Sequence, residues 1–280
     1  MEEERASVGY VFRLEDAHQY QDWFTTEPGR SAAAIEKEVL HRVWSPVLPQ
    51  SVLEVGCGTG LFLEWLAGFG HQVTGIEPSP HMLEIARKRV PPRIALDRGF
   101  AEDLPYEDNA FDTVALITTL EFVDHPRRAL EEACRVARRH VILGVLNKYS
   151  IISAQRVIES LWRASVYRKA RFYGVFELQR LVAEVLSGPV PMRWRTCLCF
   201  PLPLLRYLRF IERSRFMHCH PFGHFIAMRI DMCYPMRTIQ DPLLHDLPSS
   251  VGRPGYHASC WLSVPPRRVT PGESHPHGVA

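Results

Sequence analysis

Short apolar runs alternate with longer amphipathic stretches between residues 50 and 147. The short runs predict strands at SVLEV (51–55), QVTGIE (72–77), RIALDRG (93–99), FDTVALIT (111–118) and HVILGVLN (140–147). The amphipathic stretches between them predict helices at LFLEWLAGFG (61–70), HMLEIARKRV (81–90) and HPRRALEEACRVARR (125–139). Such alternation indicates an α/β fold: a doubly wound, Rossmann-like, mostly parallel sheet with helices on both faces.

The flanking regions follow other patterns. Residues 17–44 predict helical structure broken at Pro28-Gly29, and residues 151–186 predict two more helices. The runs MRWRTCLCF and HFIAMRID predict two closing strands, which we expect to complete the sheet as an antiparallel edge. We therefore divide the chain into four parts. These are an N-terminal helical lid (1–46), a core (47–147), a C-terminal half (148–240) with an Arg-rich helical insertion at about 201–223, and a tail (241–280).

Composition narrows the class of protein. The 280 residues are 46% hydrophobic and 23% charged, as in ordinary globular proteins, and no apolar run approaches the length of a membrane span. The N-terminus lacks the apolar core of a secretory signal, and the seven cysteines show no disulfide spacing, which favours a cytoplasmic location. The tail holds seven of the 22 prolines, so we expect it to be disordered and dispensable for folding.

Charge is unevenly distributed along the chain. Residues 1–150 carry a net charge of −7, whereas residues 151–240 carry +9. The basic part fits either solvated arginine-rich helix faces or a surface for an anionic substrate, a membrane or a partner. Peripheral contact with a membrane is therefore one of the alternatives, and we expect no binding of nucleic acid.

Three alternate glycines directly follow the first predicted strand. Gly56, Gly58 and Gly60 form an E-x-G-x-G-x-G pattern with Glu54. A turn this bare lets a ligand lie against the backbone. A dinucleotide site would need a small residue where Leu61 stands, and an acid at the strand end would repel a pyrophosphate. The pattern favours a nucleoside that carries an amino acid, over the alternative of a nicotinamide cofactor.

A second acid supports a nucleoside site. Glu77 ends the second predicted strand, 21 residues after Gly56, where an acid accepts hydrogen bonds from ribose hydroxyls. Without the glycine pattern, an acid at this position could equally well cap the next helix. Together with the glycines, it favours the ribose.

The successive motifs resemble one family. VLEVGCGTG, GIEPSPHMLEIARKR and AEDLPYEDNAFDTVALITTLEFVDHPRRALEEACRVARR are similar to those of class I S-adenosylmethionine-dependent methyltransferases, of the type 11 group, over roughly residues 50–147. The resemblance implies S-adenosylmethionine as the cofactor and methyl transfer as the activity. It implies a cofactor site made of Glu54, Gly56, Cys57, Gly58, Gly60, Glu77, Pro78, Met82, Ala101, Glu102, Thr119 and Leu120. YQDWFTTEPGR is similar to the family's lid, which would add Tyr20 and Trp23.

One position departs from the family pattern. Family members usually have an acid directly before the Ala-Glu pair, hydrogen-bonded to the adenine amino group, and this chain has Phe100 there. Either the phenyl ring packs on the adenine, or Asp103 or a water molecule replaces the acid.

The acceptor side is less defined. Tyr20, Glu121 and His125 are candidates for a general base, and Asp124 is expected to be the N-cap of the helix after it. Arg206, Arg209 and Arg213, on the predicted helix of the insertion, lead us to expect a small anionic acceptor. The scattered cysteines and histidines match no zinc spacing, and we expect no metal. The alternative function is a catalytically inactive protein of the same fold that binds the cofactor or a partner.

Overall fold

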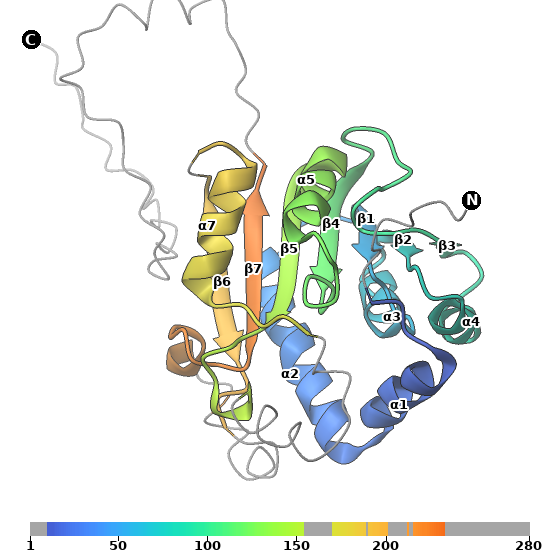
Figure 1. Cartoon of the computed structure of the whole chain (residues 1–280), viewed down its shortest axis with the longest axis horizontal. Helices are drawn as coiled ribbons and strands as arrows, with labels where there is room; N and C mark the ends of the chain where they lie inside the picture. The colour runs from blue at the N-terminus through green and yellow to red at the C-terminus, as the bar shows by residue number, and fades with distance from the viewer. Residues whose placement is uncertain (1–9, 154–169, 189, 201–211, 213–214, 233–280) are drawn as a thin grey trace, which may run out of the picture.

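The computed structural model of the chain describes residues 10–153, 170–188, 190–200, 212 and 215–232. Its centre is a seven-stranded sheet in the order β3-β2-β1-β4-β5-β7-β6 (Figure 1). The strands are β1 (Ser51–Val55), β2 (Gln72–Ile76), β3 (Ala95–Asp97), β4 (Phe111–Ile117), β5 (Ala137–Leu146), β6 (Met192–Cys197) and β7 (Phe225–Asp231). The strand order changes direction between β1 and β4, so the ligand crevice of a doubly wound sheet is expected at their carboxyl ends.

Both predicted closing strands belong to this sheet. β1 to β5 pair in parallel, whereas β7 runs antiparallel to β5 on one side and to β6 on the other. The predicted α/β fold, with a mostly parallel sheet and an antiparallel edge, is confirmed.

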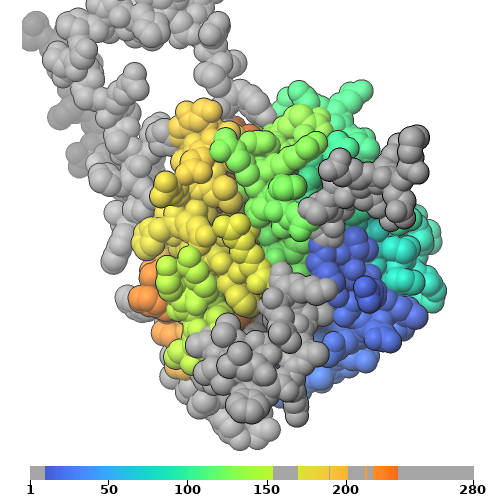
Figure 2. All heavy atoms as spheres, in the orientation of Figure 1, coloured from blue at the N-terminus to red at the C-terminus, as the bar shows by residue number. Residues whose placement is uncertain are grey.

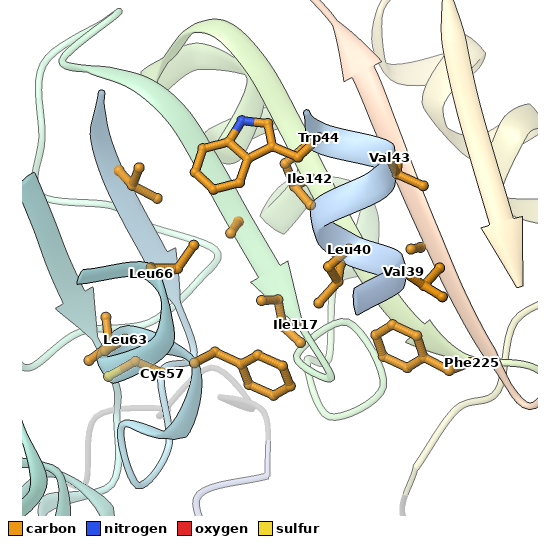
Figure 3. Close-up of a cluster of buried hydrophobic side chains, with 14 of the residues drawn as sticks. Val39, Leu40, Val43, Trp44, Cys57, Leu63, Leu66, Ile117, Ile142 and Phe225 are labelled. Carbon is orange, nitrogen blue, oxygen red and sulfur yellow. The ribbon is translucent and has the colours of Figure 1, made fainter. Parts of the chain in front are cut away.

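Helices cover both faces of the sheet. α2 (Glu27–Trp44), α3 (Leu61–Ala67) and α4 (Pro80–Arg89) contribute to one hydrophobic cluster, and α5 (Pro126–Val136) and α7 (Val175–Val185) contribute to the other (Figure 1). Figure 3 shows α2 directing Leu40 and Trp44 toward Ile142 of the sheet. A short 3₁₀ helix, η2 (Arg215–His218), lies beside β6. α1 (Leu14–Thr25) packs against α2 and α4, outside the sheet layers.

Several element boundaries differ from the sequence prediction, and two of them have a clear physical reason. The N-terminal helices separate at Thr26, and Pro28 lies in the first turn of α2, where its missing N–H costs no hydrogen bond. Thr26 Oγ1 accepts a hydrogen bond from Gly29 N at 3.1 Å and so caps the helix. Arg138 and Arg139 belong to β5 and not to the preceding helix, because β5 begins at Ala137.

Some predicted features lie outside the described residues. These are the tail (241–280), most of the insertion (about 201–223), and with it Arg206, Arg209 and Arg213. Among the described helices, none combines the length and the apolar character needed to cross a membrane.

Candidate cofactor site

A cleft opens at the carboxyl ends of β1, β2 and β4, where the strand order predicts a ligand site. It contains about 640 Å³ of empty space, counting its open mouth. Its wall is formed by Tyr10, Phe12, Tyr20, Gly56, Gly58, Glu77, Pro78, Met82, Phe100, Ala101, Glu102, Thr118, Thr119, Phe122 and Val123. Nine of the predicted cofactor residues are in this wall: Tyr20, Gly56, Gly58, Glu77, Pro78, Met82, Ala101, Glu102 and Thr119.

The three glycines of the turn after β1 all have positive φ, but different atoms surround the position where each would carry a Cβ. A Cβ on Gly56 would lie 2.5 Å from Thr119 Cγ2, and a Cβ on Gly60 would lie 3.0 Å from Val90 Cγ1 of the segment after α4. A Cβ on Gly58 would point into the cleft, with Tyr20 Cε1 at 3.9 Å as its one neighbour among the described residues. Gly56 and Gly60 therefore allow close packing of the protein, whereas Gly58 leaves space for a ligand.

Glu77 connects the glycine turn to the end of β2. Its Oε2 accepts a hydrogen bond from Gly58 N and its Oε1 accepts one from Ser79 N, both at 3.0 Å. Burial raises the pKa of Glu77 to about 7, against the lowering effect of these two bonds. Each carboxylate oxygen can accept a further hydrogen bond from a group in the cleft.

An aromatic wall closes the cleft on the side of the N-terminal segment. Tyr10 N donates to Phe122 O at 2.9 Å, and Ser79 Oγ donates to Phe12 O at 2.7 Å, so residues 10–12 bridge the loop after β4 and the N-terminus of α4. The ring of Phe12 lies 5.1 Å from that of Phe122 and 6.1 Å from that of Tyr20, both edge-on. Figure 2 shows the N-terminal part of the described chain, in blue, on the surface beside cyan and green segments.

The loop after β3 forms another part of the cleft wall. Phe100 contributes to the wall directly, whereas Asp103 is exposed and its N–H donates to Phe100 O. The carboxylate of Glu102 accepts hydrogen bonds from the backbone N–H groups of Asp124 and His125, at 3.2 and 3.4 Å. His125, and not the predicted Asp124, is the N-cap residue of α5, because the helix begins at Pro126.

The remaining predicted cofactor residues are not in the wall. Glu54 is buried, with no described group in hydrogen-bond range of Oε2, and burial raises its pKa well above the usual value. Cys57 and Leu120 are buried within the two hydrophobic clusters, and Gly60 packs near α4. Trp23 is half-buried on α1, and its carbonyl accepts hydrogen bonds at the end of that helix.

The three candidates for a general base are dispersed. Tyr20 is in the cleft wall, and His125 is exposed at the start of α5. Glu121 is buried behind the cleft wall, where Oε1 accepts a hydrogen bond from Leu146 N at 2.6 Å. Its Oε2 has no hydrogen-bond partner among the described residues, and burial raises the pKa of Glu121 to about 8. The structure does not bring the three together.

Several wall residues were missed by the sequence analysis. Phe12 and Phe122 belong to segments more than 100 positions apart, and neither has a local pattern that identifies a ligand. The one available signal is the apolar run around Phe12 before the first helix. Phe100 was not missed: its place in the wall favours the alternative in which its ring packs on the adenine over replacement of the acid by Asp103 or a water molecule. Among the described residues, no three histidine, cysteine or acidic side chains are grouped to hold a metal ion.

Comparisons of the chain with known proteins agree on one family. Residues 53–144 match the family described as "Methyltransferase domain". An uncharacterised protein from Methanocaldococcus jannaschii is 28% identical over 60% of this chain and 77% of its own length. An uncharacterised methyltransferase from Mycobacterium tuberculosis is 37% identical over 36% of this chain, and the match spans only 41% of that relative.

A solved structure resembles nearly the whole described fold. It is an S-adenosylmethionine-dependent methyltransferase from Thermotoga maritima, described as a possible histamine N-methyltransferase. The alignment has a TM-score of 0.63 and 26% identity, and it covers 79% of this chain and 97% of that one.

Proposed function

Because the chain belongs to the class I S-adenosylmethionine-dependent methyltransferases of the type 11 group, we propose that it transfers the methyl group of this cofactor to a small-molecule acceptor. The single observation that supports this most strongly is the pairing of Gly58 with Glu77 in the wall of the cleft. Glu77 holds both ribose hydroxyls in this proposal, and Gly58 lets the nucleoside approach the backbone.

The cleft fits the cofactor in three respects. A Cβ on Gly58 would meet only Tyr20 Cε1 among the described residues, at 3.9 Å, Glu77 has acceptor capacity left on each oxygen, and Phe100 adds an aromatic side chain to the wall. Buried Glu54 lies just before the glycine turn, outside the cleft wall, and an ammonium group bound nearby would favour its charged form against the burial that raises its pKa. When bound, S-adenosylmethionine supplies an electrophilic methyl group on a positively charged sulfur.

The protein's own contribution is positioning and exclusion of water. Tyr10, Phe12, Tyr20 and Phe122 surround one side of the cleft with aromatic rings. Such a wall keeps water from the reacting atoms, and its ring faces are compatible with a cationic sulfur. Holding the nucleophile close to the methyl group is the main requirement of an in-line displacement.

The acceptor itself is proposed only as a class. We predict an anionic acceptor from Arg206, Arg209 and Arg213, which lie outside the described part of the chain. Its test is the triple variant with glutamine at these positions. We expect it to raise KM for the acceptor and to leave cofactor affinity unchanged. An unchanged KM would contradict the anionic acceptor.

Turnover tests the proposed activity. The full-length protein is incubated with methyl-labelled S-adenosylmethionine and fractions of small molecules from a cell extract, and S-adenosylhomocysteine and labelled product are measured. We expect both to form with at least one fraction and to decrease together in Glu77→Ala. Cofactor binding without S-adenosylhomocysteine in every fraction would favour the alternative, an inactive binding protein of the same fold.

A further inference from the structure

A second hollow lies at the opposite end of the central strands from the cofactor cleft. It is bounded by the end of α2, the loop to β1 and the starts of β4 and β5, and it contains about 800 Å³ of space, counting its open mouth. Its wall is formed by Trp44, Ser45, Pro46, Val47, Leu48, Pro49, Gln50, Asp112, Arg138, Arg139, His140 and Arg229. These residues are at the amino ends of the parallel strands, so the hollow shares no wall residue with the cofactor cleft.

Two guanidinium groups in this hollow share one carboxylate. Arg138 Nη2 lies 2.5 Å from Asp112 Oδ1, and Arg139 Nε lies 3.4 Å from the same oxygen. The other oxygen of Asp112 accepts hydrogen bonds from Ser51 N and Ser51 Oγ, both at 3.1 Å. Asp112 therefore has no oxygen free for a second full pairing, and among the described residues no further acid pairs with Arg138 or Arg139, which leaves an excess of one positive charge there.

The neighbouring charges do not remove this excess. Arg229 Nε lies 2.6 Å from Asp231 Oδ1, and His140 Nδ1 lies 3.1 Å from the same atom. Arg229 Nη1 also donates to Trp44 O at 2.9 Å, which holds its guanidinium at the wall. The carboxylates of Asp112 and Asp231 thus each pair with two basic side chains. The wall of the hollow has three arginines and one acid, Asp112, and Asp231 pairs with Arg229 and His140 from outside the wall.

The rim of the hollow adds apolar surface. Val47 and Leu48 are 93% and 71% exposed, between Pro46 and Pro49. The two prolines restrict the backbone of the loop, so ordering this backbone around a ligand costs less conformational entropy. The side chains of Arg138 and Arg139 are 55% and 62% exposed in the same hollow.

We propose that this hollow binds a phosphate or carboxylate group carried on an apolar body. Arg138 and Arg139 receive the anion, since a guanidinium presents several donors in a fork that matches both groups. Val47 and Leu48 contact the apolar part. The site is independent of methyl transfer and therefore does not rest on the proposed function.

Calorimetric titration of the full-length protein tests this site, with phenyl phosphate and inorganic phosphate as probes at about 0.15 M ionic strength. We expect Arg138→Gln/Arg139→Gln to weaken binding of both probes by about tenfold or more. Val47→Ser/Leu48→Ser should weaken binding of phenyl phosphate and leave that of inorganic phosphate unchanged. The matched control is Arg127→Gln/Arg180→Gln, which removes the same charge from exposed pairs on α5 and α7 and should change neither affinity.

Three outcomes would overturn the proposal. One is equal weakening in the control, which would show that net charge alone attracts the probes. Another is full binding by Arg138→Lys/Arg139→Lys, which keeps the charge and loses the fork. The third is binding to vesicles containing phosphatidylserine without binding of either soluble probe. Unchanged thermal melting and unchanged S-adenosylmethionine affinity show that each variant is folded.

Discussion

The Gly58 amide donates a hydrogen bond to Glu77 Oε2 at 3.0 Å, which joins the turn after β1 to the acid at the end of β2. The two residues are 19 positions apart, and the parallel pairing of β1 with β2 brings them together. The bond fixes the carboxylate while leaving it in the wall of the cleft. One contact therefore positions both the bare backbone and the acceptor group that a ribose requires.

The different surroundings of the glycines predict different effects of substitution. Gly58→Ala places a methyl group in the cleft, so we expect S-adenosylmethionine affinity to fall by about tenfold or more, or about 1.4 kcal/mol. Gly60→Ala pushes against Val90 and Ala86, so overpacking should cost about 1–3 kcal/mol of folding free energy. The positive φ costs both variants about 1–2 kcal/mol.

Denaturant unfolding and calorimetry on the same two variants separate these effects. The expected pattern is greater loss of stability in Gly60→Ala and greater loss of affinity in folded Gly58→Ala. If Gly58→Ala bound the cofactor as tightly as the wild type, the ligand would not lie against this part of the turn.

The place of Phe100 in the cleft wall predicts a stacking contribution. Phe100→Ala should weaken binding of S-adenosylhomocysteine by about 1–3 kcal/mol, the usual range for a base stacked on an aromatic ring. Phe176→Ala is a suitable control, because Phe176 is exposed on α7 and is not in the cleft wall. Equal affinities of Phe100→Ala and wild type would instead favour a water molecule or Asp103 at the adenine.

Buried Glu121 predicts a pH dependence of stability. Its pKa rises from 4.5 in the unfolded chain to about 8 on burial, so the folded state binds more protons between these values. Its contribution to stability is therefore full below about pH 4.5 and is lost as pH rises through about 8. In Glu121→Gln the side chain stays neutral, and the melting temperature should fall less between pH 5 and pH 8 than in the wild type.

A matched control isolates this effect. Glu131→Gln replaces an exposed acid on α5 and should keep the pH dependence of the wild type. Identical pH profiles for Glu121→Gln and the wild type would show that Glu121 ionises normally in the folded protein.

The strands were predictable because burial on both faces leaves a continuous apolar run. Residues 51–55 form β1 as predicted, and the run ending at Asp231 forms β7. The start of β5 was missed because Ala137, Arg138 and Arg139 continue the composition of the preceding helix. Pairing of β5 with β4 and β7 overrides that local preference.

The cleft was predictable only where its residues follow a strand directly. Gly58 and Glu77 come from motifs with a fixed distance from a strand end, so their convergence follows from parallel pairing. Phe12 meets Ser79 and Phe122 through long-range contacts that no spacing along the chain encodes. The sequence alone could not show whether Gly60 packs against a helix or contacts a ligand, because both roles require the same small residue.

Calorimetric titration of S-adenosylmethionine into the wild type and Glu77→Ala tests the central claim most directly. At a pH above the pKa of Glu77, which is about 7, loss of hydrogen bonds to this charged acceptor should weaken binding by about 1.5–3 kcal/mol, roughly 10- to 150-fold. Glu84→Ala, which removes an exposed acid from α4, should bind like the wild type. Equal affinity in a folded Glu77→Ala variant, or no binding by the wild type, would contradict the assignment of this cleft to the cofactor.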